Sequence, residues 1–247
     1  MDNPWLEMEN LSESDDMVLK IDEPLVSAYN AEFGEKSPHH LQLNVPPLPF
    51  IGSSEAPVVL LLANPGYDVE HDKNWSKDKF INDGILANLH RKPDASLFFV
   101  SKEYRKLGDV SQWWKERTKE LANAIGKEHS LSGTAEQQTE RGFEDIEKKL
   151  LAIEYHPYHS KEWQPPFRTF ESQTFTFDLV QKAMDREATI IIGRCVKHWY
   201  ASVPDLRAYK HVITFDSPRS THISENNLNN KPKNPNTFKK IVKKMIE

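Results

Sequence analysis

The sequence contains a single cysteine, Cys195, and no long hydrophobic run. One cysteine excludes an internal disulfide framework and a zinc site built from several cysteines. The longest apolar run, Val58 to Ala63, is far shorter than the roughly 20 residues that cross a bilayer. The N-terminus is acidic rather than rich in Lys and Arg, so it does not resemble a secretory signal. These absences predict a cytoplasmic protein that does not contact a membrane.

Glycine is also sparse. The nine glycines are so widely spaced that the chain contains neither a GxGxxG turn nor a Walker-type phosphate loop. Enzymes that use those motifs to bind NAD or ATP are therefore disfavoured, and we expect no cofactor. A chain of 247 residues fits one large domain with decorations, and we expect a monomer.

The charge is distributed unevenly along the chain. Residues 1–35 carry a net charge of −9, whereas the rest of the chain carries +4. An acidic arm could shield a basic body or mimic nucleic acid, and the simpler interpretation is a solvated extension. A proline-rich segment, Val45–Pro49, then suits an extended connector. We therefore expect an acidic arm and connector over residues 1–50, followed by one α/β domain over residues 51–247.

Four apolar segments bounded by turn residues predict strands that are buried on both faces, and helical patterns lie between them. The strands are expected at Pro57–Ala63, Leu150–Tyr155, Ala188–Gly193 and His211–Phe215, and the helices at Asp109–Lys127, Ser172–Arg186, Arg194–Ala201 and 236–246. The last of these helices has an apolar stripe opposite a row of lysines. Residues 128–142, rich in Ser, Gly, Thr, Gln and Glu, predict an exposed loop. The order of elements predicts a three-layer α/β/α sandwich around a mostly parallel sheet of about four strands.

Polar and aromatic residues follow the ends of three expected strands. Ligands of open α/β sheets bind beyond the carboxyl ends of the strands, so these residues are candidates for one shared site. They are Asn64, Pro65, Gly66, Tyr67 and Asp68 after the first strand, Glu154, Tyr155, His156, Tyr158 and His159 after the second, and Asp216, Ser217, Pro218, Arg219, Ser220, Thr221 and His222 after the last.

Three of these segments resemble the uracil-DNA glycosylase superfamily. The segments are LLLANPGYD (60–68), LLAIEYHPYHS (150–160) and ITFDSPRSTHIS (213–224). The first is similar to the asparagine-proline-glycine motif of the mismatch-specific and thymine-DNA glycosylase branches. The last occupies the place of the superfamily's second motif, which enters the minor groove. The resemblance covers roughly residues 55–225 and implies hydrolysis of the N-glycosidic bond of a flipped base in single- or double-stranded DNA.

The resemblance also implies roles for single residues. Asn64 would position the attacking water, because an amide can orient water without adding a charge. Pro65, Gly66 and Tyr67 would line the base pocket, and Gly66 falls where the strict uracil-excising branch has a pocket-closing tyrosine. The superfamily's usual histidine-proline pair is replaced here by Ser217-Pro218, and His222 is a candidate substitute for the histidine.

Other residues would contact the base or the DNA backbone. Glu154 lies where several branches use an asparagine to recognise the base edge; while ionised it would accept hydrogen bonds and donate none. Tyr155 and Tyr158 could stack on the base, and His156 could donate a hydrogen bond to it. Ser217 and Ser220 could bond phosphates, and Arg219 could enter a minor groove or clamp a phosphate.

Each of these segments also has a purely structural interpretation, and two other functions remain open. Asn-Pro-Gly is an ordinary turn after a buried strand, and the segment after the last strand can be a polar loop. One rival function is a nucleic-acid-binding relative that has lost its chemistry, indicated by the missing histidine-proline pair. The other is an unrelated hydrolase that uses His156, His159 and Asp68. Pro157 opposes a helix that would bring the two histidines together, so no metal site is expected.

Overall fold

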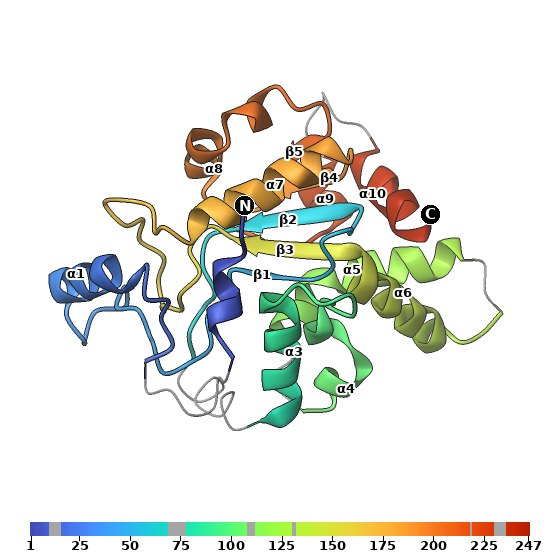
Figure 1. Ribbon diagram of the computed structural model, residues 1–247. Coiled ribbons are helices and arrows are strands. Elements are labelled where there is room, and N and C mark those ends of the chain that lie inside the picture. The colour runs from blue at the N-terminus through green and yellow to red at the C-terminus, as the bar shows by residue number, and fades with distance from the viewer. Residues whose placement is uncertain (10–15, 69–77, 108–111, 130–131, 218, 230–235) are drawn as a thin grey trace.

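The computed structural model describes residues 1–9, 16–68, 78–107, 112–129, 132–217, 219–229 and 236–247 (Figure 1). Its centre is a five-stranded sheet with the strand order β1-β3-β2-β4-β5. The strands are β1 (Phe50–Ile51), β2 (Val58–Leu62), β3 (Leu150–Glu154), β4 (Thr189–Ile192) and β5 (Val212–Thr214). All neighbours are parallel except β1, which pairs antiparallel with β3. The expected α/β class with a mostly parallel sheet is confirmed.

All four expected strands are present, and the fifth, β1, was not expected. The two residues of β1 are too few to show a hydrophobic period, so only pairing with β3 defines the strand. Every residue of β2 is buried, as the uninterrupted run of valines and leucines requires. Burial on both faces means that helices cover the sheet.

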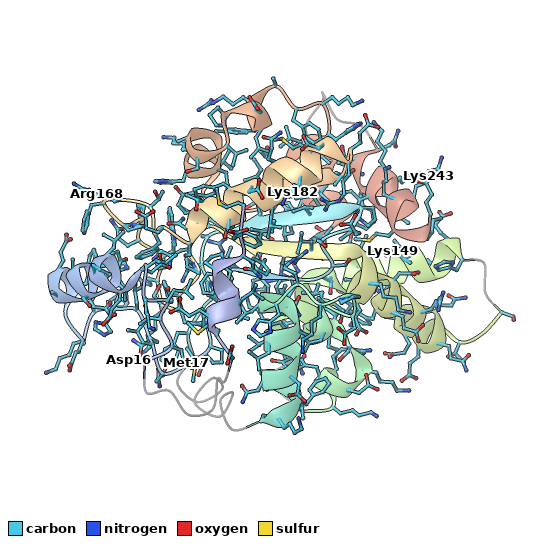
Figure 2. The ribbon with its side chains drawn as sticks, viewed as in Figure 1. Asp16, Met17, Lys149, Arg168, Lys182 and Lys243 are labelled. Carbon is cyan, nitrogen blue, oxygen red and sulfur yellow. The ribbon has the colours of Figure 1, made fainter. Side chains whose placement is uncertain are left out.

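Four helices lie close to the positions that the sequence predicts. They are α5 (Gln112–Glu128), α7 (Gln173–Asp185), α8 (Val196–Ser202) and α10 (Thr237–Ile246). Helix α7 packs on β4, and α10 packs on β2 and α5. The apolar stripe of α10 is buried, whereas its lysines are exposed, and Figure 2 shows Lys243 pointing away from the molecule. The further helical elements, which were not expected, are η1 (Pro4–Glu7), α1 (Glu23–Phe33), α3 (Lys79–Leu89), η3 (Phe98–Val100), α4 (Lys102–Arg105), η5 (Pro204–Arg207) and α9 (Glu225–Leu228).

The predicted exposed loop over residues 128–142 is wrong for most of its length. Helix α6 (Ala135–Lys149) begins inside it, at a capping box in which Thr134 and Gln137 exchange side-chain and backbone hydrogen bonds. The helix packs tightly on α5: a Cβ atom at Gly142 would lie 2.0 Å from the carbonyl oxygen of Ala122. The polar composition of this segment reflects the outer face of an amphipathic helix rather than a loop.

The described part of the N-terminal segment is packed into the body and is not a solvated extension. Trp5, Leu19 and Tyr29 are at most 1% exposed and belong to the same apolar core as the sheet. The buried Asp22 carboxylate accepts a hydrogen bond from the Tyr158 hydroxyl at 2.7 Å. The segment is therefore an integral part of the fold, with Asp22 buried inside it and other acidic residues, such as Glu32 and Glu35, on its surface.

The strand order defines where a ligand can enter the sheet. The chain runs from β2 to β3 on one side and then crosses to β4 on the other side of β2. The connections that leave β2 and β4 therefore diverge at the carboxyl edge, and such divergence opens a crevice in doubly wound folds. None of the helices within the described ranges has the length and apolar character needed to span a bilayer.

Candidate functional site

A cavity of about 880 Å³ lies at the carboxyl edge of the sheet. Its volume falls within the range of small-molecule sites in proteins. Residues that follow β2, β3 and β4 line it together with aromatic residues from η3, α4 and α5. The lining residues used below are Asn64, Gly66, Tyr67, Asp68, Phe99, Tyr104, Trp113, Trp114, Glu154, His159, Lys161, Glu162, Trp163, Arg194, Cys195 and Thr221.

The amide of Asn64 is held in one orientation. Its Nδ2 donates to the carbonyl oxygen of Pro65 at 2.9 Å and to the carbonyl and hydroxyl oxygens of Ser160 at 3.2 and 3.0 Å. The two carbonyl oxygens can only accept hydrogen bonds, so the nitrogen must face them. Asn64 Oδ1 makes no hydrogen bond to the described residues and is left as an acceptor beside the cavity.

The turn that carries Asn64 is fixed by the segment after β3. Gly66 and Ser160 form an isolated parallel bridge, and Ser160 N donates to Pro65 O at 3.3 Å. The buried His159 ring lies between two carbonyl oxygens, with Nδ1 at 2.7 Å from Gly66 O and Nε2 at 3.1 Å from Pro46 O. Burial lowers the pKa of His159 to about 4. The ring is therefore neutral at pH 7 and can donate to only one of the two carbonyls.

Gly66 leaves the cavity open. Apart from its two chain neighbours, a Cβ atom at this position would meet no atom of the described residues within 4 Å, so no close packing among them requires a glycine there. Gly66 is exposed, and Pro65 before it is buried. A larger side chain at residue 66 would project into open space at the cavity instead of clashing with the backbone.

Glu154, the last residue of β3, is one of three acidic residues that line the cavity within the described part of the chain. It pairs with Leu62 in the β2–β3 register, two residues before Asn64, so the carboxyl and the amide reach the cavity from adjacent strands. Its Oε2 is buried and has no hydrogen-bond partner among the described residues. Burial raises the pKa of Glu154 to about 8, and the positive charge of Arg194 offsets only part of this effect. Glu154 is thus mostly protonated at neutral pH, and in this form its carboxyl group can donate a hydrogen bond.

Arg194 and Cys195 follow β4 and line the same cavity as Glu154. Cys195 has a left-handed backbone conformation with φ 41°, and its thiol donates to Leu62 O at 3.3 Å. Burial and the negative form of Glu154 raise the pKa of the Cys195 thiol well above its ordinary value. The thiol is therefore not a nucleophile at neutral pH, and its electrostatic coupling to Glu154 places the two groups close together.

Aromatic side chains form much of the cavity wall. Trp113 and Trp114 meet edge to face at 4.9 Å, and Arg117 stacks on Trp113 at 5.1 Å. Phe99 and Tyr104 form a second edge-to-face pair at 4.8 Å. The sequence analysis names none of these aromatic residues as site candidates, because they lie within helical segments and not after an expected strand. The density of tryptophans was the signal available in the sequence.

Three of the expected substrate-binding residues do not line the cavity. Tyr155 points to the opposite face of the sheet from Glu154, where its hydroxyl lies 2.8 Å from Ser202 Oγ and its ring packs on Trp199. Consecutive strand residues face opposite sides, which explains this divergence. His156 and Tyr158 are 1% exposed and pack on Phe170 in the core. Burial lowers the pKa of His156 to about 3, so its ring is neutral.

The segment after β5 reaches the cavity through Thr221 rather than through the residues expected to bind DNA. Thr221 Oγ1 accepts a hydrogen bond from Arg117 Nε at 3.3 Å. Ser217 and Arg219 are exposed and Ser220 and His222 are partly buried, and none of the four lines the cavity. Pro218 lies outside the described residues. Asn227 organises this segment by accepting from Ser217 N and donating to the carbonyls of Ser220 and His222.

The three residues of the alternative hydrolase hypothesis are separated. His156 lies in the core, His159 is held between backbone carbonyls, and only Asp68 and His159 line the cavity. Within the described ranges, no three His, Cys, Asp or Glu side chains are grouped to hold a metal ion. The geometry therefore does not support that hypothesis.

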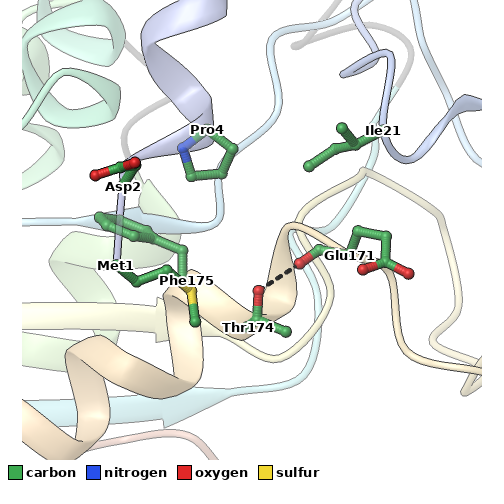
Figure 3. A pocket seen from close by; sticks show the side chains of 7 residues that line it. All are labelled: Met1, Asp2, Pro4, Ile21, Glu171, Thr174 and Phe175. Carbon is green, nitrogen blue, oxygen red and sulfur yellow. Dashed lines mark hydrogen bonds between the residues drawn. The ribbon is translucent and has the colours of Figure 1, made fainter.

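A second hollow, of about 480 Å³, lies where the N-terminus meets the start of α7 (Figure 3). Met1, Pro4, Ile21 and Phe175 contribute apolar atoms, and Thr174 Oγ1 donates to Glu171 O at 2.6 Å. Its lining includes acidic side chains but no side-chain amide, and Phe175 is its one aromatic residue among the described residues. The larger cavity brings an acid, an amide and several aromatic side chains together. The larger cavity is therefore the candidate site.

Comparisons with protein-family models, with curated proteins and with solved structures found no match to this chain.

Proposed function

We propose that the chain is a DNA base-excision glycosylase that hydrolyses the N-glycosidic bond of a flipped, damaged or mismatched base. The observation that carries this proposal is the orientation of Asn64, whose Nδ2 is held by Pro65 and Ser160 while Oδ1 is left as an acceptor beside the cavity. The proposal includes the three-layer α/β/α arrangement of the uracil-DNA glycosylase superfamily, which the three segments resemble.

The mechanism follows from what an uncharged acceptor can do. Hydrolysis needs a water molecule on the far face of the sugar from the departing base, in line with the bond that breaks. Asn64 Oδ1 would accept a hydrogen bond from that water and direct its lone pair towards C1′. Because the amide is already held by three acceptors, no reorganisation is needed when the transition state forms.

The cavity also suits a flipped base. Trp113, Trp114 and Trp163 supply aromatic faces for stacking, as enzymes that extrude a base commonly do. The exposed cations Lys161, Arg194 and Arg219 follow β3, β4 and β5 on the same edge of the sheet and would meet the phosphates. Lys161 and Arg194 line the cavity itself, so a backbone held by them would bring the base to its mouth.

Base release from synthetic DNA tests the proposal directly. Single- and double-stranded oligonucleotides that carry uracil, hypoxanthine, xanthine or a mismatch are incubated with the protein, and alkaline cleavage then reveals abasic sites. We expect release from at least one oligonucleotide, and no release from any would contradict the proposed activity. DNA binding without release would support the alternative, a binding relative without chemistry, which His222 outside the cavity favours.

Substitution of Asn64 tests the mechanism. We expect Asn64→Ala to lower turnover by about 100- to 1000-fold with little change in DNA affinity, because the amide acts in the transition state. Asn64→Asp restores an acceptor and should retain more activity than the alanine variant. Equal rates for wild type and Asn64→Ala would contradict the assigned role even if the wild type excises a base.

A further inference from the structure

The proposed role of Asn64 leaves the carboxyl group of Glu154, which lines the same cavity, without a function. Its carboxyl makes no hydrogen bond or ion pair to the described residues, although Oε2 is shielded from solvent. An ionised carboxylate without partners is costly in such a place, and loss of the charge removes most of that cost. The carboxyl group therefore keeps its proton and faces the cavity as a potential donor.

The other charged and titratable groups around the cavity leave the carboxyl group of Glu154 protonated. Those among the described residues that line the cavity with Glu154 are Tyr67, Asp68, Tyr104, His159, Lys161, Glu162, Arg194 and Cys195. Arg194 is the cation whose charge acts on Glu154, and it forms no ion pair with it. His159 is neutral, and the Cys195 thiol stays protonated beside Glu154. Burial thus holds Glu154 in the protonated form that a general acid needs.

We propose that Glu154 is the general acid that protonates the departing base, an inference that rests on the proposed glycosylase function. The amide of Asn64 and the carboxyl of Glu154 enter the cavity from adjacent strands, so one can serve the water and the other the base. A general acid is needed most when the base is a poor leaving group. The proposed substrate class is therefore a purine-type base with a protonatable ring nitrogen, such as hypoxanthine.

The proposed step is balanced as follows. The O–H bond of Glu154 breaks and its proton bonds to the ring nitrogen N3 or N7 of the purine. The electron pair of the C1′–N9 bond goes to the base, which leaves neutral. A lone pair of the water held by Asn64 forms the new bond to C1′, and that water releases a proton to solvent. Glu154 then recovers a proton from solvent.

A pH profile of single-turnover excision by the full chain tests this inference with a hypoxanthine oligonucleotide. Burial raises the pKa of Glu154 to about 8, so the carboxyl is mostly neutral at pH 7 and mostly ionised at pH 9. We expect the wild-type rate to be constant below pH 7 and to fall about tenfold between pH 7 and pH 9. A flat profile over this range would overturn the inference.

Glu154→Gln is the matched variant, because glutamine has the same shape and donates a hydrogen bond but cannot transfer a proton. We expect its excision rate at pH 7 to be about 100-fold lower or more, with unchanged DNA affinity and no fall towards pH 9. Glu55→Gln, at an exposed carboxylate in the turn before β2, is the control and should keep the wild-type profile. Circular dichroism and thermal unfolding show that each variant is folded.

The leaving group supplies a second, independent readout. Uracil leaves as a comparatively stable anion, so Glu154→Gln should slow uracil release much less than hypoxanthine release. A wild-type rate in Glu154→Gln, or equal slowing for both bases, would overturn the role of general acid while the glycosylase function stands. If the wild type releases no base from any oligonucleotide at any pH, the proposed function fails, and the inference fails with it.

Discussion

Asn64 and Glu154 line the same cavity, but only the side chain of Asn64 has hydrogen-bond partners among the described residues. The Asn64 amide nitrogen has three acceptors around it, whereas the Glu154 carboxyl has no hydrogen-bond partner among the described residues. The first arrangement fixes an orientation, and the second changes a protonation state. The proposed cleavage would use the first group to hold the water and the second to protonate the departing base.

The raised pKa of Glu154 predicts how stability depends on pH. The folded state holds the proton more tightly than the unfolded chain, whose carboxyl has the ordinary value of 4.5. The stability contribution is therefore fully present below about pH 4.5 and is lost as the pH rises through about 8. We expect the free energy of unfolding of wild type, relative to Glu154→Gln, to fall by up to a few kcal/mol over this range, since a tenfold change in proton affinity corresponds to about 1.4 kcal/mol.

Urea unfolding of both proteins at intervals from pH 4.5 to pH 9 measures this difference, and Glu128→Gln, at an exposed residue at the end of α5, serves as the surface control. The comparison with glutamine cancels titrations elsewhere in the chain, because both proteins share them. A constant difference across the range would show that Glu154 is ionised in the folded protein.

At the scale of elements, the segment between β5 and α9 depends on one asparagine. Asn227 is 6% exposed, and its side chain bridges Ser217, Ser220 and His222. The segment has little apolar burial of its own apart from Phe215 and Ile223, which flank it. Its path past Arg117, and hence the position of Thr221 at the cavity, is therefore set by polar contacts.

Asn227→Ala is expected to lower the free energy of unfolding by about 1–3 kcal/mol. The substitution leaves the Ser217 amide and two carbonyl groups without their partner, and unmet buried polar groups cost about this much. Thermal and urea unfolding measure the loss, and faster amide hydrogen exchange should be confined to residues 216–222. Asn44→Ala, at an exposed asparagine, is the control and should change stability by less than about 0.5 kcal/mol. An equal effect of the two substitutions would contradict the bridging role.

At the scale of the whole molecule, the N-terminal segment and the α/β body share one core. Trp5 and Tyr29 pack near the segment after β3: Trp5 lies 6.4 Å from the Tyr158 ring, and the Tyr29 hydroxyl donates to Gln164 O. Each large apolar side chain that is fully buried contributes roughly 1.5–3 kcal/mol. Deletion of residues 1–35 therefore removes both their negative charge and their buried side chains, so it cannot measure the effect of the charge alone.

Deletion of residues 1–35 is expected to lower the thermal midpoint strongly or to prevent folding, because it removes Trp5, Leu19 and Tyr29 from the core. A charge-only variant in which the exposed Asp2, Glu9, Glu32 and Glu35 become amides should keep the wild-type midpoint. Differential scanning calorimetry compares the two. A truncated chain as stable as the wild type would contradict the structural role of this segment. Tighter, salt-dependent DNA binding by the charge-only variant would measure electrostatic shielding without unfolding.

The sequence alone determined the elements whose signals are local. Uninterrupted apolar runs ended by turn residues identified β2 to β5, and the apolar stripe of α10 identified that helix, because burial on one or both faces leaves its mark within a few residues. The same logic placed Asn64 and Glu154 after parallel strands. It therefore predicted that both reach one edge of the sheet, and both line the cavity.

Only the tertiary structure decided what those residues face. Tyr155 and His156 follow Glu154 directly, yet both are packed outside the cavity, whereas Trp113 reaches it from a separate element, α5. The protonation of Glu154 and the packing of Trp5 are likewise outcomes of burial. Burial depends on which segments cover a residue in space, and those segments can lie far away in the chain, as Trp5 does from Tyr158. The spacing of residues along the chain does not show which distant segments bury a residue. For this physical reason the protonation state of Glu154 follows only from the folded structure.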